Sequence, residues 1–425
     1  MSTDDQLDLL SYHAAPGFVA RRNIQRISAD VPTINTTTSR GPVRIQLSPL
    51  CIDLSTFVIE ATMSILNDAS TPTTYFNSLH ATSAISRVVL NVGGRTVCDI
   101  QGANLIRSAL YKAFSPSTAS GLMDIFESTT WGGASSTSAK QTYDAAGVSV
   151  LFRPFDGQFG RNMLPLHLIN AQAEILLYLA DLPEVLNTAS TGTPATIGYQ
   201  LSNITAVFDS LTLTPEFDAR LRQAAMSPNG LPVHMKSMYQ FTNNWQSTTY
   251  QQSAPVQASS LRQVYVILRN AANLAQSNAE TLSTYVNPLS SIQLNIAGTL
   301  FPAQPMVCNT SPPVDPYFQL VRCQHAISDE PSIEESEFLF TSTMGSTLNT
   351  TTYSGTGGGF FIGLDVSRQV SRDTLSGVNT MNSAQPVIVN MACSSTPSYQ
   401  VRSDVFTVFD SFLNIKGNGQ FTVVQ

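Results

Sequence analysis

The sequence predicts an all-β protein made of two similar β-sandwiches in tandem. Two short segments recur at nearly one spacing: LNVGG at residues 90–94 returns as LNIAG at 294–298, and VFDSL at 207–211 returns as VFDSF at 408–412. Both segments have the apolar pattern of strands, and many further short strand patterns are separated by loops rich in Gly, Pro, Ser and Thr. Because two unrelated segments share almost the same offset, we infer that one module of about 200 residues is used twice.

The composition favours a structural part whose surface is largely covered by neighbours. Charged residues make up only 12% of the 425 residues, so the polar surface must come from neutral side chains, which cost less to desolvate than ions. The chain has 18 arginines and four lysines, and arginine is the cation that interfaces favour; compositional drift is the alternative explanation. The net charge of −7 excludes a broad basic face for nucleic acid. No apolar run reaches the length of a membrane span.

The cysteines indicate thiols rather than a disulfide framework or a zinc site. There are five of them, an odd number, and none forms a CxxC unit. We therefore expect buried thiols in a protein made in a reducing compartment. The five are Cys51, Cys98, Cys308, Cys323 and Cys393.

Residues 1–40 are predicted to form an N-terminal arm, mostly extended and with at most one short helix. Its first ten residues are acidic and polar, which is not typical of a secretory signal. A basic cluster follows at Arg21, Arg22 and Arg26. Such an arm would tether the protein to a neighbour, a membrane surface or a packaged genome; a frayed terminus is the alternative.

The first module is predicted over residues 41–225. Its strands alternate apolar and polar residues, and Gly93-Gly94 signals a turn after one of them. Apolar residues at helical spacing predict a helix over 104–114 with Asn104 as its N-cap, followed by a long loop over 115–147. Pro215 and Pro228 mark the module's end. The predicted strands cover residues 43–47, 57–63, 85–92, 148–152, 164–169, 173–179 and 204–213.

The second module, residues 226–425, is predicted to repeat this order. A polar loop is expected at 243–260, a short helix from Asp315-Pro316 through Arg322, and an acidic and then a glycine-rich loop after it. The predicted strands cover residues 235–241, 263–268, 291–296, 360–366, 386–391, 405–413 and 420–424. Eight strands per module is the jelly-roll count. The predicted fold is therefore two tandem eight-stranded jelly-roll β-sandwiches, each with a short helix and long loops.

No catalytic, cofactor-binding or metal-binding residues are predicted. His167 lies in an LHL strand pattern and is interpreted as a solvent-facing residue. Cys323 and His325 would need a third, orienting group, and helix geometry points them apart. The glycines at 355–359 lead into a strand rather than into the helix of a phosphate loop, and the acidic run at 329–337 lacks the order of a calcium loop. A carboxylate pair for glycoside hydrolysis stays open, since its separation is a three-dimensional quantity.

Several segments resemble the double jelly-roll major capsid proteins of polinton-like viruses, adintoviruses, virophages and tailless membrane-containing bacteriophages. In the first module these are FNSLH at 76–80 and SRVVLNVGG at 86–94, followed by the predicted helix. In the second they are SIQLNI at 291–296 with Pro302 and Pro305, FIGLD at 361–365 with SGV at 376–378, and the ending from DVF at 404–406 to NGQ at 418–420. The resemblance spans roughly residues 41–425, and no motif of it covers the arm.

This resemblance implies a structural function and no enzyme activity. It implies a homotrimer whose six barrels form a pseudo-hexameric capsomer that tiles an icosahedral virus shell, with neighbouring capsomers, penton and minor capsid proteins as partners. It also implies location in the virion, with the arginine-bearing arm in contact with an inner membrane, the genome or neighbours. The alternatives are another viral surface part, such as a spike, penton or receptor-binding protein, and a carbohydrate-active β-sandwich. The loops at 115–147 and 243–260 are expected to face outward.

Overall fold

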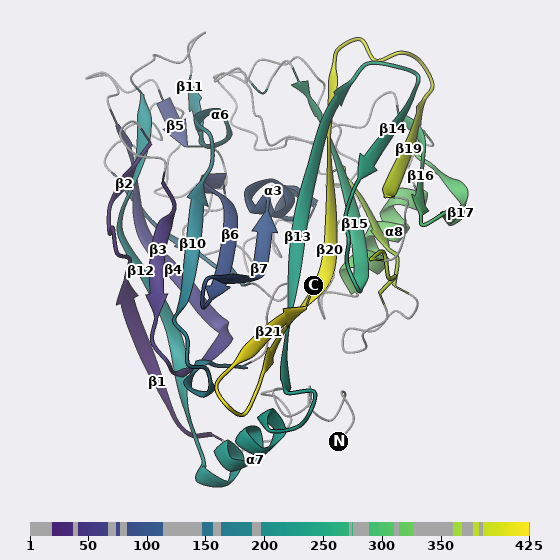
Figure 1. Cartoon of the computed structure of the whole chain (residues 1–425). Helices are drawn as coiled ribbons and strands as arrows, with labels where there is room; N and C mark the ends of the chain where they lie inside the picture. The colour runs from purple at the N-terminus through teal and green to yellow at the C-terminus, as the bar shows by residue number, and fades with distance from the viewer. Residues whose placement is uncertain are drawn as a thin grey trace.

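Two β-sandwiches stand side by side in the computed structural model of this chain (Figure 1). The structure describes residues 19–36, 41–66, 74–76, 83–113, 147–155, 163–188, 197–271, 274, 289–309, 314–325, 360–367, 377–381 and 386–424. The predicted acidic loop at 329–337, the glycine-rich loop at 355–359 and the long loop at 115–146 lie outside these residues.

The first sandwich packs a sheet of order β1-β12-β4-β8 against strands of order β3-β10-β6-β7. Its eight main strands in chain order are β1 (Val19–Ser28), β3 (Val43–Leu47), β4 (Cys51–Leu66), β6 (Ile85–Val92), β7 (Arg95–Gln101), β8 (Val148–Phe152), β10 (Ala173–Leu179) and β12 (Gly198–Leu213). Minor elements are β2 (Ile34–Asn35), β5 (Thr74–Phe76), β9 (Met163–Pro165), β11 (Leu186–Thr188), the helices α3 (Ala103–Ala113) and α6 (Leu182–Val185), and the 3₁₀ turn η2 (Leu166–Leu168).

The second sandwich repeats this order. Its sheets run β13-β20-β15-β18 and β14-β19-β16-β17. Its strands are β13 (Leu231–Trp245), β14 (Thr249–Ala254), β15 (Leu261–Asn270), β16 (Leu289–Ile296), β17 (Thr299–Val307), β18 (Ile362–Asp365), β19 (Val387–Cys393) and β20 (Val401–Ile415), with helix α8 (Val314–His325) after the fifth. In both sandwiches the first, eighth, third and sixth strands form one sheet, and the second, seventh, fourth and fifth form the other. The prediction of two tandem eight-stranded jelly rolls is confirmed.

The two sequence repeats that predicted this duplication lie at equivalent places: VFDSL and VFDSF on the eighth strands β12 and β20, and LNVGG and LNIAG at one hairpin used twice. Gly93 and Gly94 join β6 to β7, while Ala297 and Gly298 join β16 to β17. All four residues have positive φ, at +54°, +75°, +54° and +86° in chain order. Two-residue hairpin turns need this backbone because it matches the twist of the strands. A helix follows each hairpin, α3 in the first sandwich and α8 in the second.

The core of each sandwich lies between its two sheets, where alternate side chains of every strand meet. In the first sandwich the ring of Phe57 on β4 stacks on Phe208 of the paired strand β12, with centroids 5.2 Å apart, and meets Phe155 edge-on at 5.6 Å. All three side chains are at least 98% buried. Burying large aromatic side chains of this kind stabilises a fold by about 1.5–3 kcal/mol each.

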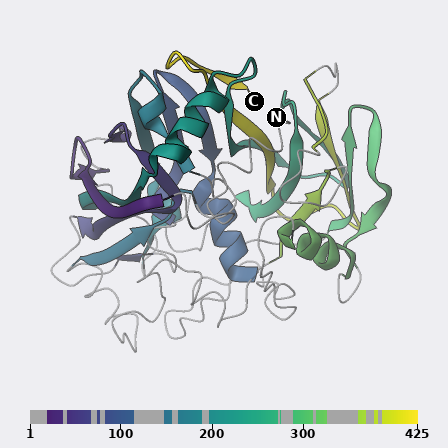
Figure 2. The same ribbon diagram turned by 90° about the horizontal axis from the view of Figure 1, so that it is seen from below.

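The two sandwiches share a sheet. Strand β7 of the first runs parallel to β13 of the second, with Ile100 opposite Met238, so that nine strands form one continuous sheet. Helix α7 (Pro215–Ala225) links the sandwiches beneath them, and the last strand, β21 (Phe421–Val424), returns alongside β20 (Figures 1 and 2). The two sandwiches are therefore built from a six-stranded sheet, the shared nine-stranded sheet and a four-stranded sheet.

The predicted arm over residues 1–40 is wrong for residues 19–28, which form β1, the first strand of the first jelly roll. Strand β1 pairs along its length with β12. Its inward side chains include Asn23 and Gln25, and Gln25 Nε2 donates to Ser210 Oγ at 3.1 Å. Because polar residues point inward here, the strand lacks the apolar alternation that identifies strands in a sequence.

Two further predictions are wrong in detail, and one helix is missing from the predicted elements. Residues 243–260 are not one loop, since β13 extends to Trp245 and β14 covers Thr249–Ala254. The exposed side chains of these two strand segments are polar, so their strand pattern is weak. His167 lies in the 3₁₀ turn η2 rather than in a strand. Helix α7 was not predicted, because Pro215 was interpreted only as a boundary, although proline at the first helical position is favourable.

Candidate functional site

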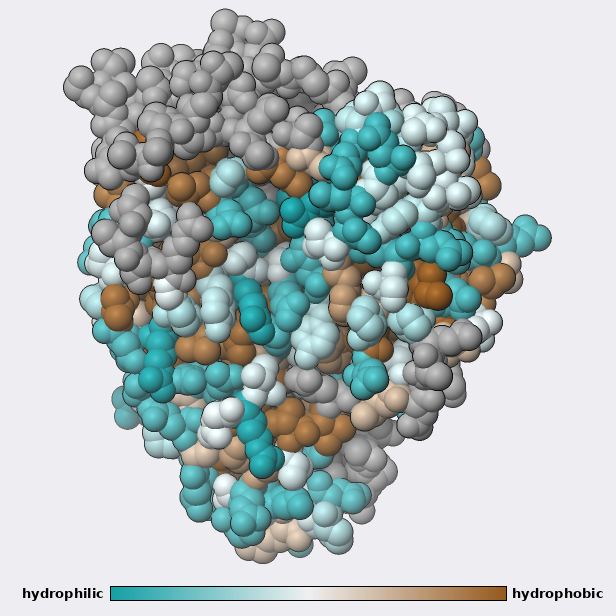
Figure 3. All heavy atoms as spheres, turned by 45° about the horizontal axis from the view of Figure 1, so that its top comes forward, coloured by the Kyte–Doolittle hydropathy of each residue, from teal (hydrophilic) through white to brown (hydrophobic). Residues whose placement is uncertain are grey.

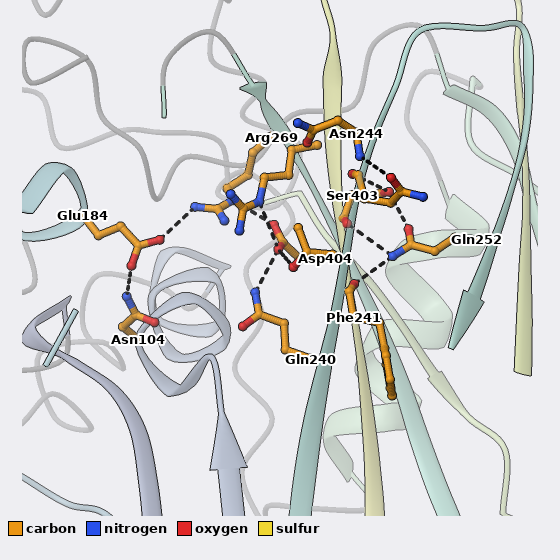
Figure 4. Close-up of polar contacts among 12 residues, drawn as sticks. Asn104, Glu184, Gln240, Phe241, Asn244, Gln252, Arg269, Ser403 and Asp404 are labelled. Atoms are coloured by element: carbon orange, nitrogen blue, oxygen red, sulfur yellow. Dashed lines mark hydrogen bonds and ion pairs between the residues drawn. The ribbon is translucent and has the colours of Figure 1, made fainter. Parts of the chain in front are cut away.

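A buried polar network connects the two sandwiches (Figure 4). Arg269 of β15 donates from Nε to Asp404 Oδ2 of β20 at 2.9 Å, and the two side chains are 1% and 0% exposed. Asp404 Oδ1 also accepts hydrogen bonds from Gln240 Nε2 at 2.8 Å and Thr242 Oγ1 at 2.9 Å. A buried carboxylate is stable only when it is paired in this way.

The network continues into the first sandwich. Glu184 of α6 lies 3.5 Å from Arg269 Nη1, and its other oxygen accepts a hydrogen bond from Asn104 Nδ2 at 2.7 Å. Asn104 was predicted to cap helix α3, but it lies one residue inside that helix, and its amide donates to Glu184 and to the Ser83 carbonyl. Two acids and one arginine thus join three elements from the two halves of the chain.

The electrostatics of Asp404 favour its ionised form. Burial alone would raise the pKa of this carboxyl, but the charges of Arg269 and Arg402, with the hydrogen bonds from Gln240 and Thr242, more than offset burial and hold the pKa below its ordinary value. The ion pair is therefore charged near neutral pH.

A second buried carboxylate, Asp410, lies lower on β20. His234 Nε2 is 2.7 Å from Asp410 Oδ1, Ser260 Oγ donates to Asp410 Oδ2, and Arg262 is 3.9 Å away. Burial raises the pKa of Asp410, but His234, Ser260 and Arg262 together lower it below its ordinary value. The Ser260 hydroxyl bonds the carboxylate rather than the imidazole, so His234 is not placed to activate it as a nucleophile. The cluster connects β13, β15 and β20 through their side chains.

The strands that join the sandwiches also make close backbone contacts. Cys98 Sγ donates to the Lys236 carbonyl at 3.0 Å, and the Asp99 amide donates to Ser237 Oγ at 3.2 Å. At the C-terminal end, the Asn170 amide donates to the Gly419 carbonyl at 3.0 Å. These hydrogen bonds link the first sandwich to the second.

The basic cluster predicted for the arm lies on β1. Arg22 Nε donates to Asp209 Oδ2 at 2.7 Å, and Arg26 Nη1 lies 2.8 Å from Glu60 Oε2. Arg22 and Arg26 therefore neutralise acids of neighbouring strands in their own sheet, while Arg21 is exposed. The side chains of Arg22 and Arg26 are 52% and 62% exposed.

The other residues that the sequence singled out are spread over the fold. His167 Nε2 lies 2.9 Å from Asp218 Oδ1 of α7. Cys323 is fully buried, and burial raises the pKa of its thiol. Burial likewise raises the pKa of Cys51 and of Cys308 to about 12. Among the described residues, no group of three or more His, Cys, Asp and Glu side chains is arranged to hold a metal ion, and no helix is long and apolar enough to cross a membrane.

The outer face of the sheet β14-β19-β16-β17 is neutral and hollowed. A shallow depression of about 340 Å³ lies there, and across its floor Gln251, Asn390 and Gln293 stand in register on adjacent strands. Among the described residues, the buried Asn390 Oδ1 has no hydrogen-bond partner. The matching face of the first sandwich instead carries ion pairs such as Arg87–Asp99 at 2.7 Å. Covering the neutral face therefore costs less desolvation free energy than covering the face with ion pairs.

Exposed apolar residues are dispersed rather than gathered in one area. In the view of Figure 3, hydrophobic residues form small separate patches among hydrophilic ones. Several of the most exposed lie on the two outermost edges of the molecule and on α8. They are Ile24 on β1, Leu300 and Val307 on β17, and Val314 and Phe318 on α8, each at least 40% exposed.

A comparison with solved structures finds the same architecture in chains of virus structures. The chain superposes on a chain of the Sputnik virophage structure with a TM-score of 0.55 and 12% identity, over 96% of this chain and 89% of that chain. It superposes on the Faustovirus major capsid protein with a TM-score of 0.56 and 12% identity, over 96% and 92% of the two chains. These neighbours are double jelly-roll capsid proteins. The chain has their fold.

A chain of the PBCV-1 virus capsid gives the same result, with a TM-score of 0.54 and 12% identity over 95% of this chain and 97% of that one. No protein-family model and no curated protein sequence matches the chain. This chain and these capsid structures therefore share the double jelly-roll fold, although their sequences are only about 12% identical and sequence comparison finds no match.

The sequence singles out Asn104 only as a helix cap and Asp404 only as part of the segment DVF, and it assigns no role to Arg269 or Glu184. Arg269 follows the apolar run VYVIL, and Asp404 precedes VF. The signal in the sequence is a charged residue next to an apolar strand pattern. It indicates a buried ion pair, because a charge must be paired when both faces of its strand are covered. Its partners cannot be named without the fold.

Proposed function

We propose that this protein is the major capsid protein of an icosahedral virus and acts as a structural part rather than as an enzyme. The observation that carries the proposal is the upright pair of jelly rolls joined through one nine-stranded sheet, an architecture shared along nearly the whole chain with virophage and large-virus capsid proteins.

The assembly we propose is a homotrimer. Three chains would contribute six similar barrels to a pseudo-hexameric capsomer, and closed three-fold symmetry makes that unit finite. Capsomers would then tile the shell beside one another and beside penton and minor capsid proteins. A chain with few charges and a neutral outer sheet face suits such repeated contacts, because obligate interfaces bury about 2,000–5,000 Å² with little charge at their cores.

The proposed location is the virion, after synthesis in a reducing compartment. Five free cysteines, four of them buried, support this, since none is engaged in a disulfide. We also propose that the N-terminal part of the chain, through the exposed Arg21 of β1, contacts the genome, an inner membrane or a neighbouring capsomer.

The test is the native mass and outline of the purified protein. Size-exclusion chromatography with light scattering is expected to give three times the chain mass of 45.9 kDa, and negative-stain images are expected to show a six-sided particle. A stable monomer at all concentrations would refute the proposal.

A further inference from the structure

The two sandwiches differ at a pair of equivalent sheet edges. The second strand of each sandwich, β3 in the first and β14 in the second, ends its sheet and pairs on one side only among the described residues. The free side of such a strand is a row of backbone groups that can pair with another chain, so soluble proteins normally block it with charges, a proline, a bulge or a covering segment. Of these two edges, β3 is blocked in this way and β14 is not.

Strand β3 is the blocked edge. The Asp30 amide donates to the Arg44 carbonyl at 2.9 Å, so the segment after β1 already occupies part of the edge. The Arg44 side chain is 48% exposed and lies beside two acids, Asp30 and Glu174. Another strand would have to displace this backbone contact and cover these charges, which costs desolvation free energy.

Strand β14 carries no such block among the described residues. No residue of the sequence between Lys236 and Arg262 is charged, and β14 contains no proline. Its pairing with β19 is continuous from Thr249 to Ala254, without the register shift that marks a bulge. The edge is therefore a regular, uncharged template of six residues.

The backbone groups of Gln251 and Ser253 are available on this edge. Toward β19, the Cys393 amide donates to the Thr248 carbonyl at 2.7 Å. Because the direction of hydrogen bonding alternates along an antiparallel ladder, Gln251 and Ser253 point their N–H and C=O groups away from β19. Both residues are exposed, and no hydrogen bond within the described part of the chain uses these groups.

We propose that β14 pairs antiparallel with β14 of a second copy of this chain across a two-fold axis, and that this pairing joins neighbouring trimers. The contact lies outside the trimer, and it rests on the proposed function in that the joined units are trimers. At a two-fold axis each residue meets its own copy, so a charge near the axis would face a like charge. Strand β14, with the sequence TYQQSA, avoids that repulsion, whereas β3 has Arg44 on the equivalent edge.

The side chains beside the edge also suit a copy of themselves. Gln251, Asn390 and Gln293 stand in register on β14, β19 and β16, and each primary amide carries two donors and an acceptor. Pairing about Gln251 brings two such rows together, with Gln251 of one chain opposite Gln251 of the other. An amide can both donate to its own copy and accept from it, which a carboxylate or an ammonium group cannot do.

Charges introduced at Gln251 test the pairing. Gln251→Lys and Gln251→Glu each place like charges across the axis, and each is expected to raise the dissociation constant between trimers at least about fivefold. Sedimentation velocity of the purified full chain over a range of concentrations measures that constant. Gln223→Lys is the matched control, because Gln223 is also exposed but lies on α7, and it is expected to associate as the wild type does. Circular dichroism and thermal unfolding check that each variant is folded.

An equimolar mixture of the two variants gives the sharper result. A lysine then faces a glutamate across the axis, and the mixture is expected to associate again. The pairing is overturned if wild-type trimers do not associate at any concentration, if the single variants associate as the wild type does, or if the mixture stays apart. In each of these cases the trimer, and with it the proposed function, stands. If light scattering shows that the wild-type chain is a monomer, the proposed function fails, and the same variants then test the pairing through a monomer–dimer equilibrium.

Discussion

Arg269 and Asp404 form an ion pair that is almost wholly excluded from water. The donor nitrogen and acceptor oxygen are 2.9 Å apart, and the side chains are 1% and 0% exposed. Glu184, from the other sandwich, lies 3.5 Å from the same guanidinium. Because a buried charge without its partner is costly, this pair makes the fold of the second sandwich and its contact with the first depend on each other.

Substituting Asp404→Asn is expected to lower the free energy of unfolding by about 3–5 kcal/mol, because the substitution removes the nearer of the two acids that pair with the buried Arg269. Urea unfolding followed by tryptophan fluorescence measures the change. Arg26→Ala is the matched control. Its ion pair with Glu60 lies at the surface, with Arg26 62% exposed, so the expected loss is below about 1 kcal/mol. Equal losses in the two variants would contradict the role given to burial.

Acid is expected to destabilise the protein through Asp404 and Asp410. The pKa of each is lowered in the folded protein despite burial, so each group contributes stability that is complete above its unfolded pKa. That contribution is lost as the pH falls through the folded pKa, that is, below about pH 4. Unfolding free energies measured from about pH 6 to about pH 3 are expected to fall, and Asp404→Asn is expected to flatten the decline. An unchanged slope in that variant would contradict the assignment.

Gly102 is expected to tolerate no side chain. Its φ is +64°, and an added Cβ would lie 2.5 Å from Gln240 Oε1 and 2.6 Å from the Phe406 ring, both in the second sandwich. Gly102→Ala is expected to cost about 1–3 kcal/mol for overpacking in addition to about 1 kcal/mol of backbone strain. Gly94→Ala isolates the strain, since φ there is +75° with open space around the Cβ. Thermal unfolding compares the two, and a similar loss in both would show that the junction is loosely packed.

One cysteine is expected to react faster with a thiol reagent than the other four. Cys51, Cys98, Cys308 and Cys323 are buried, whereas Cys393 is half-buried. A thiolate-directed reagent near neutral pH is expected to modify about one thiol per folded chain quickly and all five after denaturation. Cys393→Ser is expected to remove the fast phase, and peptide mass spectrometry locates the label. Fast labelling of a second site would contradict the burial described.

The duplication and the strand pattern were readable from the sequence because both rest on local chemistry. The LNVGG and LNIAG segments each combine a half-buried strand with two residues that adopt positive φ, and that combination needs no knowledge of neighbours. Strands with one apolar face, such as VRIQL at β3 and AEILLYL at β10, are found at the predicted residues for the same reason.

Only the tertiary structure decided the features that depend on residues far apart in the chain. Strand β1 has the polar Asn23 and Gln25 among its inward side chains, and it becomes a strand because β12, more than 170 residues later, completes its hydrogen bonds. Arg269, Asp404 and Glu184 reveal their roles only once β15, β20 and α6 meet. Local sequence carries propensity and periodicity, but the pairing of buried charges and the filling of sheet edges are set by which surfaces the folded chain brings together.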